Sequence, residues 1–144
     1  FNQVKWYGRG PFENYEDRKT AAFIDTYECS VEEMHYPYIR PQENGYRTDT
    51  RWIRLERNDG KAILIEGIEP LCFSALHHTT TDVDEGTEKQ NRHSTDVPQR
   101  AETYLNIDYK QMGIGGDNSW YAHTHNKYKL FPGDYFYGYI IRPT

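Results

Sequence analysis

Cysteine and long apolar runs are scarce in this sequence of 144 residues, and it has no stripe of basic residues. Its longest apolar stretch, residues 135–141, falls far short of the roughly 20 residues of a membrane helix, so we expect no membrane partner. The only cysteines are Cys29 and Cys72, too few for a disulfide scaffold, and the pattern favours free thiols over a disulfide. A formal net charge of −5 without a basic stripe argues against a nucleic-acid partner.

The motifs of the common catalytic sites are also missing. Glycoside hydrolysis needs two carboxylates at a set separation, and no pair stands out among the 22 acidic residues. No Gly-x-Ser-x-Gly elbow occurs. His77 and His78 are adjacent, and His123 and His125 are two apart, but no Cys-x-x-Cys or His-Glu-x-x-His accompanies them. We therefore expect no catalytic residue and no metal ligand in this chain.

Tyrosine, in contrast, is abundant, with 13 residues in an aromatic content of 15%. Tyr fits a pleated, half-exposed surface, and the segments are short and separated by turn residues. The sequence therefore predicts an all-β fold, with a hairpin turn at Asn58-Asp59-Gly60 and a second at residues 131–133. Residues 36–50 are expected to form a loop, and residues 82–100 a loop or a short helix plus loop. The predicted strands are 20–31, 51–57, 61–66, 70–76, 102–109, 127–130 and 134–141.

A glycine-rich stretch at residues 113–120 ends in Trp120. It lacks the Lys-Ser/Thr of a phosphate loop, and Asp117 would repel a phosphate. As a sugar site it is chemically sensible, because an aromatic face packs on sugar C–H groups while Asn and Asp side chains bind hydroxyls. The pattern alone leaves open the alternative that Trp120 fixes the loop to the core.

Two other stretches carry glycine and many polar groups. Residues 7–18 predict a turn with charge pairs, such as Glu16 with Arg18 or Lys19. Residues 37–45 either line a site or form a structural loop whose Glu and Asn side chains satisfy backbone donors.

Taken together, three sequence blocks resemble a known family. Residues 6–15, WYGRGPFENY, followed by Asp17 and Arg18, resemble a signature of the long, lactose-operon-type β-galactosidases of glycoside hydrolase family two. Residues 37–45, PYIRPQENG, are similar to the family's Pro-Tyr-x-x-Pro-x-Glu-Asn-Gly. Residues 105–120 are similar to its closing block, LNID followed by MGIGGD and SW. The blocks occur in the family's order and cover nearly the whole chain.

The resemblance implies an antiparallel β-supersandwich of the galactose-mutarotase-like type. Residues 1–144 would be the C-terminal portion of the fifth and last domain, which belongs to the small chain of the enzyme. Because the sequence starts inside a motif, we expect a partial domain with unpaired strand edges. The implied reaction is retaining hydrolysis of terminal β-D-galactosides such as lactose. In the family the catalytic glutamates and the magnesium and sodium sites lie in other domains, so we expect an inactive isolated chain without a cofactor.

The resemblance also assigns roles to residues. Trp120 matches the Trp that this domain contributes to the family's active site, and we expect it to bind substrate. Glu13, Asn14, Glu43 and Asn44 match family signatures and are interpreted as structural. The expected partners are a galactoside, the other domains of the parent chain and further copies in a homo-oligomer. The cytoplasm and the periplasm both remain open, and the alternatives are a free-standing carbohydrate-binding module or a purely structural, assembly domain.

Overall fold

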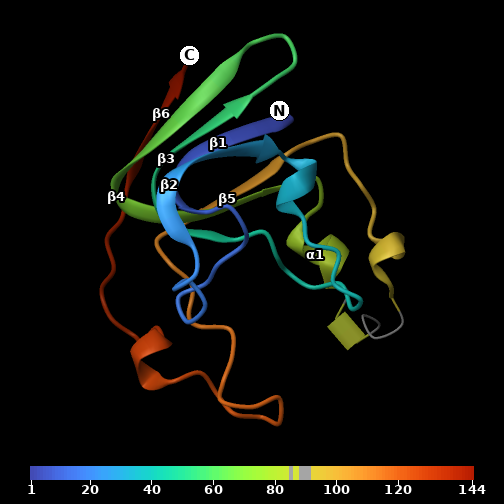
Figure 1. The fold of residues 1–144 in the computed structure, drawn as a ribbon, viewed down its shortest axis with the longest axis vertical. Coiled ribbons are helices and arrows are strands. Elements are labelled where there is room, and N and C mark those ends of the chain that lie inside the picture. The colour runs from blue at the N-terminus through green and yellow to red at the C-terminus, as the bar shows by residue number, and fades with distance from the viewer. Residues whose placement is uncertain (85, 88–91) are drawn as a thin grey trace.

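A computed structural model describes residues 1–84, 86–87 and 92–144. Six antiparallel strands form one twisted sheet in the order β2-β1-β3-β4-β5, with β6 also paired to β4 (Figure 1). The all-β antiparallel fold expected from the resemblance is confirmed. The strands are β1 (Gln3–Gly10), β2 (Phe23–Ser30), β3 (Arg47–Glu56), β4 (Ala62–Leu76), β5 (Tyr104–Asp108) and β6 (Tyr139–Pro143). The short helices include η1 (Glu32–Met34), α1 (Thr80–Val83), η3 (Ser94–Asp96) and η4 (Asn126–Tyr128).

The turn between β3 and β4 forms where the sequence predicts it. Arg57 N–H donates to the Lys61 carbonyl at 2.9 Å, and Gly60 has φ of 81°, a conformation that favours glycine. In the predicted loop of residues 82–100, η3 forms as a short helical turn and α1 overlaps its start. Residues 85 and 88–91 of that loop lie outside the described residues.

One long strand, β4, replaces the two strands predicted at 61–66 and 70–76, so the predicted break is wrong. Its first half pairs with β6 and its second half with β5, both on the side away from β3. The change of partner occurs around Gly67, where an added Cβ would lie 2.2 Å from the Glu69 carbonyl oxygen. Gly67 therefore lets the strand bend sharply without being interrupted.

The N-terminal strand β1 contains two glycines, and for that reason the sequence predicted a turn over part of it. β1 lies between β2 and β3, and its glycines allow close approach of neighbouring strands. A Cβ on Gly8 would lie 2.6 Å from Thr50 Oγ1, and one on Gly10 would lie 2.7 Å from Tyr27 Cδ2. These glycines are packing positions within the sheet rather than signs of a turn.

The predicted C-terminal hairpin is also wrong. Residues 126–128 form η4, and β6 pairs with β4 instead of with residues 127–130. The free edge of β4 at Ile63–Gly67 offers backbone partners to β6. The aromatic and apolar pattern predicted a strand at residues 134–141, but β6 begins only at Tyr139, and the pattern does not show to which edge the strand binds.

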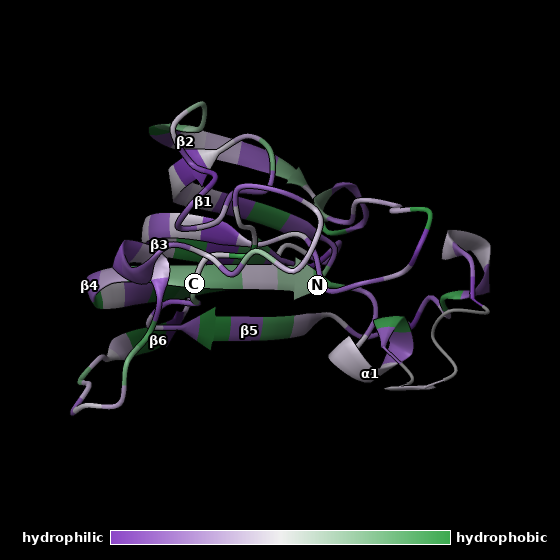
Figure 2. Ribbon diagram, turned by 90° about the horizontal axis from the view of Figure 1, so that it is seen from below, coloured by the Kyte–Doolittle hydropathy of each residue, from purple (hydrophilic) through white to green (hydrophobic). Residues whose placement is uncertain are grey.

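The core lies where alternate side chains of β1, β3 and β4 meet on one side of the sheet. Trp6 and Phe73 are fully buried, with ring centroids 6.0 Å apart in an edge-on arrangement. The indole N–H of Trp6 donates to the Arg9 carbonyl at 3.0 Å. Figure 2 shows the apolar residues of β4 and β5 along the sheet. The main buried cluster consists of Val4, Trp6, Met34, Ile53, Leu55, Ile65, Phe73, Ala75 and Leu76.

The outer strand β2 pairs with β1 and with no other strand among the described residues, and most of its side chains are exposed. β2 is therefore an edge strand of the sheet, as an open sheet requires. Cys29 at the end of β2 and Cys72 in β4 are both free thiols. No helix in the described residues is long and apolar enough to cross a membrane.

We predict that Phe73→Ala lowers the free energy of unfolding by about 3–5 kcal/mol, because it leaves a cavity beside Trp6. Urea denaturation followed by tryptophan fluorescence measures this change. Ile39→Ala serves as the control, because Ile39 is 87% exposed and should change stability little. Equal effects of the two substitutions would contradict this description of the core.

Candidate functional site

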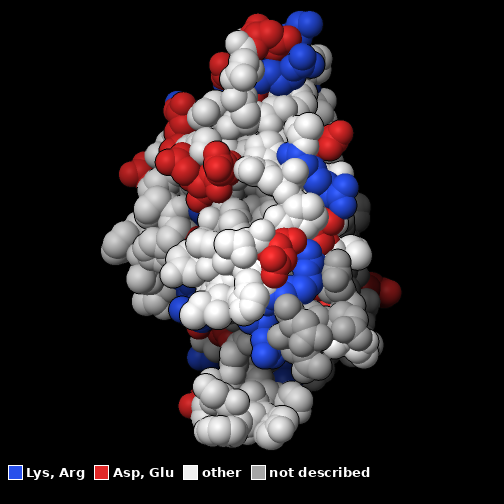
Figure 3. Space-filling model, turned by 90° about the vertical axis from the view of Figure 1, so that its right-hand side faces the viewer, with Lys and Arg blue, Asp and Glu red and all other residues white. Residues whose placement is uncertain are grey.

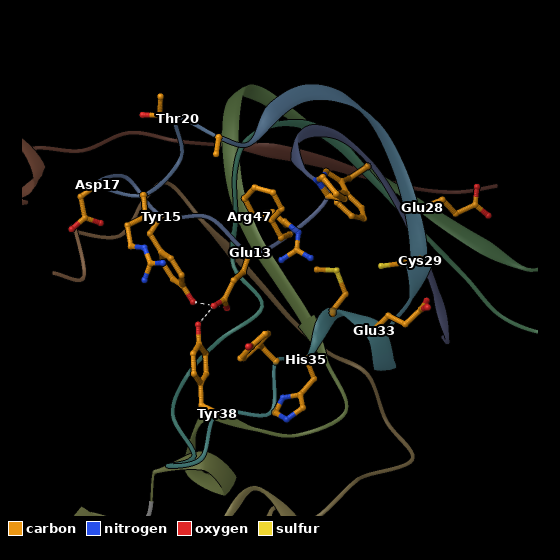
Figure 4. Close-up of a pocket in the computed structure, with 17 residues that line it drawn as sticks. Glu13, Tyr15, Asp17, Thr20, Glu28, Cys29, Glu33, His35, Tyr38 and Arg47 are labelled. Carbon is orange, nitrogen blue, oxygen red and sulfur yellow. Dashed lines mark hydrogen bonds between the residues drawn. The ribbon is translucent and has the colours of Figure 1, made fainter.

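The connection between β1 and β2 contains a carboxylate that binds this connection to the loop at residues 36–46 (Figure 4). Glu13 accepts hydrogen bonds from the Tyr15 hydroxyl at 3.1 Å, from the Gly45 N–H at 2.9 Å and from the Tyr38 hydroxyl. Burial, and then the hydrogen bond to Glu13, raise the pKa of Tyr38 to about 12, and burial likewise raises the pKa of Tyr15. Both phenols therefore remain protonated donors at neutral pH.

The neighbouring amide of Asn14 is fully buried and holds the same connection against β3. Its Oδ1 accepts from the Thr48 N–H at 3.0 Å and the Thr48 hydroxyl at 2.6 Å, while its Nδ2 donates to the Phe12 carbonyl at 3.0 Å. These contacts agree with the interpretation of Glu13 and Asn14 as structural residues. The predicted charge pairing also forms, between Glu16 and Lys19 at 3.2 Å.

A third polar residue of this connection, Asp17, holds the glycine-rich loop. Its carboxylate accepts from the N–H groups of Ile114 at 3.1 Å and Gly115 at 2.9 Å, and from the Thr124 hydroxyl at 3.4 Å. Gly113 lies so close to this carboxylate that an added Cβ would be 2.7 Å from Asp17 Oδ2. The loop is thus bound through its own backbone donors, which are not available to a phosphate.

The glycine-rich segment, drawn in orange, extends away from the sheet at the bottom of Figure 1, and Trp120 follows its glycines in the sequence. The Trp120 side chain is 80% exposed, and its backbone N–H donates to Asn118 Oδ1 at 2.7 Å. The indole therefore does not fix the loop to the core, in contrast to the alternative left open by the sequence. Asp117, which follows the glycines, pairs with His125 at 2.7 Å.

The loop at residues 36–46 contacts both the β1–β2 connection and the start of the glycine-rich segment. Asn44 accepts from the Tyr36 N–H at 3.1 Å and donates to the Gln42 carbonyl at 2.9 Å, as expected for a structural amide. Glu43 instead accepts from Gln111 Nε2 at 3.2 Å and so links this loop to the start of the glycine-rich segment. Sequence reasoning missed this link, because the two partners are far apart in the chain.

A cavity of about 880 Å³ opens between β1, β2, η1 and the loop at residues 36–46. Figure 4 shows the side chain of Arg47 inside it, above Glu13. Asp17 lines this cavity and also holds the glycine-rich loop, whereas Trp120 lies outside it. The polar and charged lining residues are Glu13, Tyr15, Asp17, Arg18, Thr20, Glu28, Glu33, His35, Tyr36, Tyr38 and Arg47.

The histidines that invited a metal interpretation do not form such a site in the described part of the chain. His35 and His78 pack edge to face with ring centroids 4.6 Å apart. No group of three or more His, Cys, Asp or Glu side chains within residues 1–84, 86–87 and 92–144 is arranged to hold a metal ion. On the face in Figure 3, one group of acidic side chains lies apart at the upper left, while acidic and basic side chains are neighbours elsewhere.

Fold and loop together define a class: an antiparallel β-domain that presents an exposed aromatic side chain on an anchored glycine-rich loop. The sequence matches the family described as beta galactosidase small chain over residues 1–141. A β-galactosidase of Priestia megaterium is 40% identical over 131 residues, which are 91% of this chain and 12% of that protein. A β-galactosidase of Vibrio cholerae is 38% identical over 141 residues, which are 98% of this chain and 13% of that protein.

The chain therefore belongs to the β-galactosidase small-chain family. It spans only about an eighth of the length of these curated relatives, with shares of 12% and 13%.

We predict that Asp17→Ala releases the glycine-rich loop while leaving the sheet intact. The N–H groups of Ile114 and Gly115 lose a charged acceptor worth about 1–3 kcal/mol, so their hydrogen exchange should accelerate roughly 5- to 150-fold. Exchange measured residue by residue tests this. Asp25→Ala is the matched control, since within the described residues its exposed carboxylate accepts a hydrogen bond only from the adjacent Thr26 N–H. Unchanged exchange at residues 114 and 115 would rule out Asp17 as the anchor.

We also predict that stability falls as the pH is lowered from about 6.5 to 5. Burial lowers the pKa of His78 from 6.5 to about 4, with His35 as a second cause. Between pH 6.5 and 5, therefore, the His78 imidazole binds a proton in the unfolded chain but not in the folded one. Urea denaturation at a series of pH values measures the slope. His78→Gln should reduce the slope, and His123→Gln, at an exposed position, should not. A slope that is identical in His78→Gln and the unmodified protein would be inconsistent with a neutral, buried His78.

Proposed function

We propose that this chain is a non-catalytic part of a longer β-galactosidase that hydrolyses terminal β-D-galactosides with retention. Residues 1–144 then form the C-terminal portion of its last domain and contribute Trp120 to the sugar site. The catalytic carboxylates and the magnesium and sodium sites are assigned to other domains of that enzyme. The described residues of this chain do not fit a metal site of their own.

One observation carries the proposal: the indole of Trp120 is 80% exposed on a loop whose base is held by Asp17. An exposed indole is available to a ligand, and contiguous exposed apolar surface marks binding sites. An indole face packs well on the C–H groups of a sugar, and Asn118 beside it provides an amide for hydroxyl groups. The loop therefore has the chemistry of a stacking platform for a saccharide.

Assembly is a second candidate function, which the C-terminal segment favours. Its exposed apolar side chains include Phe131, Phe136, Tyr137 and Ile141. Tyr109, Tyr135, Tyr137 and Tyr139 form a chain of ring contacts at centroid distances of 5.8, 6.3 and 6.4 Å. Contact of this surface with another domain or with a second copy would cover it. This role is compatible with the sugar-binding role of Trp120, because the residues differ.

We predict that Trp120→Ala in the full-length enzyme weakens galactoside binding roughly 5- to 150-fold, equivalent to about 1–3 kcal/mol of lost apolar burial. The melting temperature should hardly change, because the indole contacts no core residue. Binding is measured with a galactoside inhibitor and hydrolysis with a chromogenic galactoside. Trp120→Phe should retain part of the affinity.

The matched control is Tyr121→Ala, at the adjacent position with 95% exposure. It should leave both galactoside affinity and melting temperature nearly unchanged. A large fall in melting temperature with normal galactoside affinity in Trp120→Ala would show a structural role for Trp120. Absence of β-galactoside hydrolysis by the unmodified full-length protein would refute the proposed enzyme itself.

A further inference from the structure

Arg47, at the start of β3, is a buried cation in the wall of the cavity, with only 3% of the residue exposed. Its Nη1 donates to the carbonyl groups of Gly45 at 3.1 Å and Tyr46 at 3.3 Å. Its guanidinium lies 5.2 Å from the centre of the Trp6 ring. The Nε atom is buried and has no hydrogen-bond partner. The direct contacts of the guanidinium found among the described residues are therefore with neutral groups.

No carboxylate among the described residues forms an ion pair with Arg47, because those lining the cavity have other partners. Asp17 binds the glycine-rich loop, Glu28 pairs with Lys5 at 3.6 Å, and Glu33 accepts from the Ser30 N–H at 2.8 Å. Glu13 contributes an attractive field, but its oxygens accept from the two tyrosines and from the Gly45 N–H.

An unpaired buried charge is unfavourable by several kcal/mol. Burial lowers the pKa of Arg47 to about 10, so the group is still charged at neutral pH. A guanidinium has the planar arrangement of donors that matches a carboxylate. An additional carboxylate bound in the cavity would therefore stabilise the Arg47 guanidinium.

The rim of the cavity indicates where that carboxylate comes from. Phe12 and Tyr36, which line the opening, are 49% and 56% exposed. A free small acid would leave these rings uncovered, whereas a polypeptide that inserts an acidic side chain would cover them. The cavity, at about 880 Å³, is also far larger than one side chain requires. Most of the length of the relatives lies outside the region that this chain matches, since it spans 12% and 13% of them.

We infer that the Arg47 cavity is a docking site for an Asp or Glu side chain from a part of the β-galactosidase outside residues 1–144. The inserted carboxylate pairs with the guanidinium, and its flanking residues cover Phe12 and Tyr36. The inference rests on the proposed function only in assuming that this chain is part of a longer β-galactosidase.

A double-mutant scan in the full-length enzyme tests this inference. Each Asp or Glu outside residues 1–144 is replaced by its amide in two backgrounds, the unmodified enzyme and Arg47→Met, and melting temperatures are measured. We expect one acidic position whose replacement lowers the melting temperature by several degrees in the unmodified enzyme. In Arg47→Met the same replacement should not lower it, because it removes a carboxylate that has already lost its cationic partner. Arg57→Met provides the control background, since Arg57 is a half-exposed arginine paired with Asp59 in the β3–β4 turn. In that background the same replacement should keep its full effect.

The scan remains informative if Arg47→Met fails to fold, because Arg47→Lys then serves as the second background with weaker coupling expected. Equal shifts in all backgrounds at every acidic position would overturn the inference. A rise in melting temperature with acetate or with a galactoside, present in the unmodified enzyme and absent in Arg47→Met, would also overturn it by indicating a small ligand as the occupant.

The scan does not depend on catalysis. Failure of the unmodified enzyme to hydrolyse galactosides would refute the proposed function, and the coupling of melting temperatures could still be measured. Conversely, normal hydrolysis without any coupling to Arg47 would refute only the docking site.

Discussion

The polar side chains between β1 and β2 are the constraint on which the rest of the structure depends. Glu13 binds the loop at residues 36–46, Asn14 binds the start of β3, and Asp17 binds the glycine-rich loop. A sheet orders its own backbone, but long loops need separate acceptors for their N–H groups. One short connection provides these acceptors for both long loops. The Trp120 loop and the Arg47 cavity are therefore both held in position by the β1–β2 connection.

The two regions differ in the kind of partner they suit. Trp120 is an exposed aromatic group beside amide and carboxylate side chains, which suits a neutral, hydroxylated ligand. Arg47 is a buried cation without a carboxylate partner among the described residues, which suits an anionic side chain. Asp17 contacts the first region and lines the second. Docking of a neighbouring domain at the cavity would therefore stabilise the loop that carries Trp120.

Local chemistry made part of this structure predictable from the sequence. The turn ending at Gly60 and the strand β2 follow from residues close together in the chain. The local pattern did not decide whether Trp120 is exposed, and its expected role came from the family resemblance. Strand β1 was partly hidden because Gly8 and Gly10 serve packing against Thr50 and Tyr27, which periodicity does not show. The partner of β6 and the hydrogen bonds of Glu13 depend on contacts distant in sequence. That Arg47 lacks a carboxylate partner within residues 1–84, 86–87 and 92–144 was unpredictable for the same reason, because it depends on which partner each nearby carboxylate binds.

A structure of the full-length enzyme with a bound, unreactive galactoside would show whether the Asp17-anchored loop presents Trp120 to the sugar. We expect carbon atoms of the saccharide within about 4 Å of the indole ring, with the contacts of Asp17 to residues 114 and 115 preserved. An occupied galactoside site in which the Trp120 ring packs only against protein would contradict this expectation.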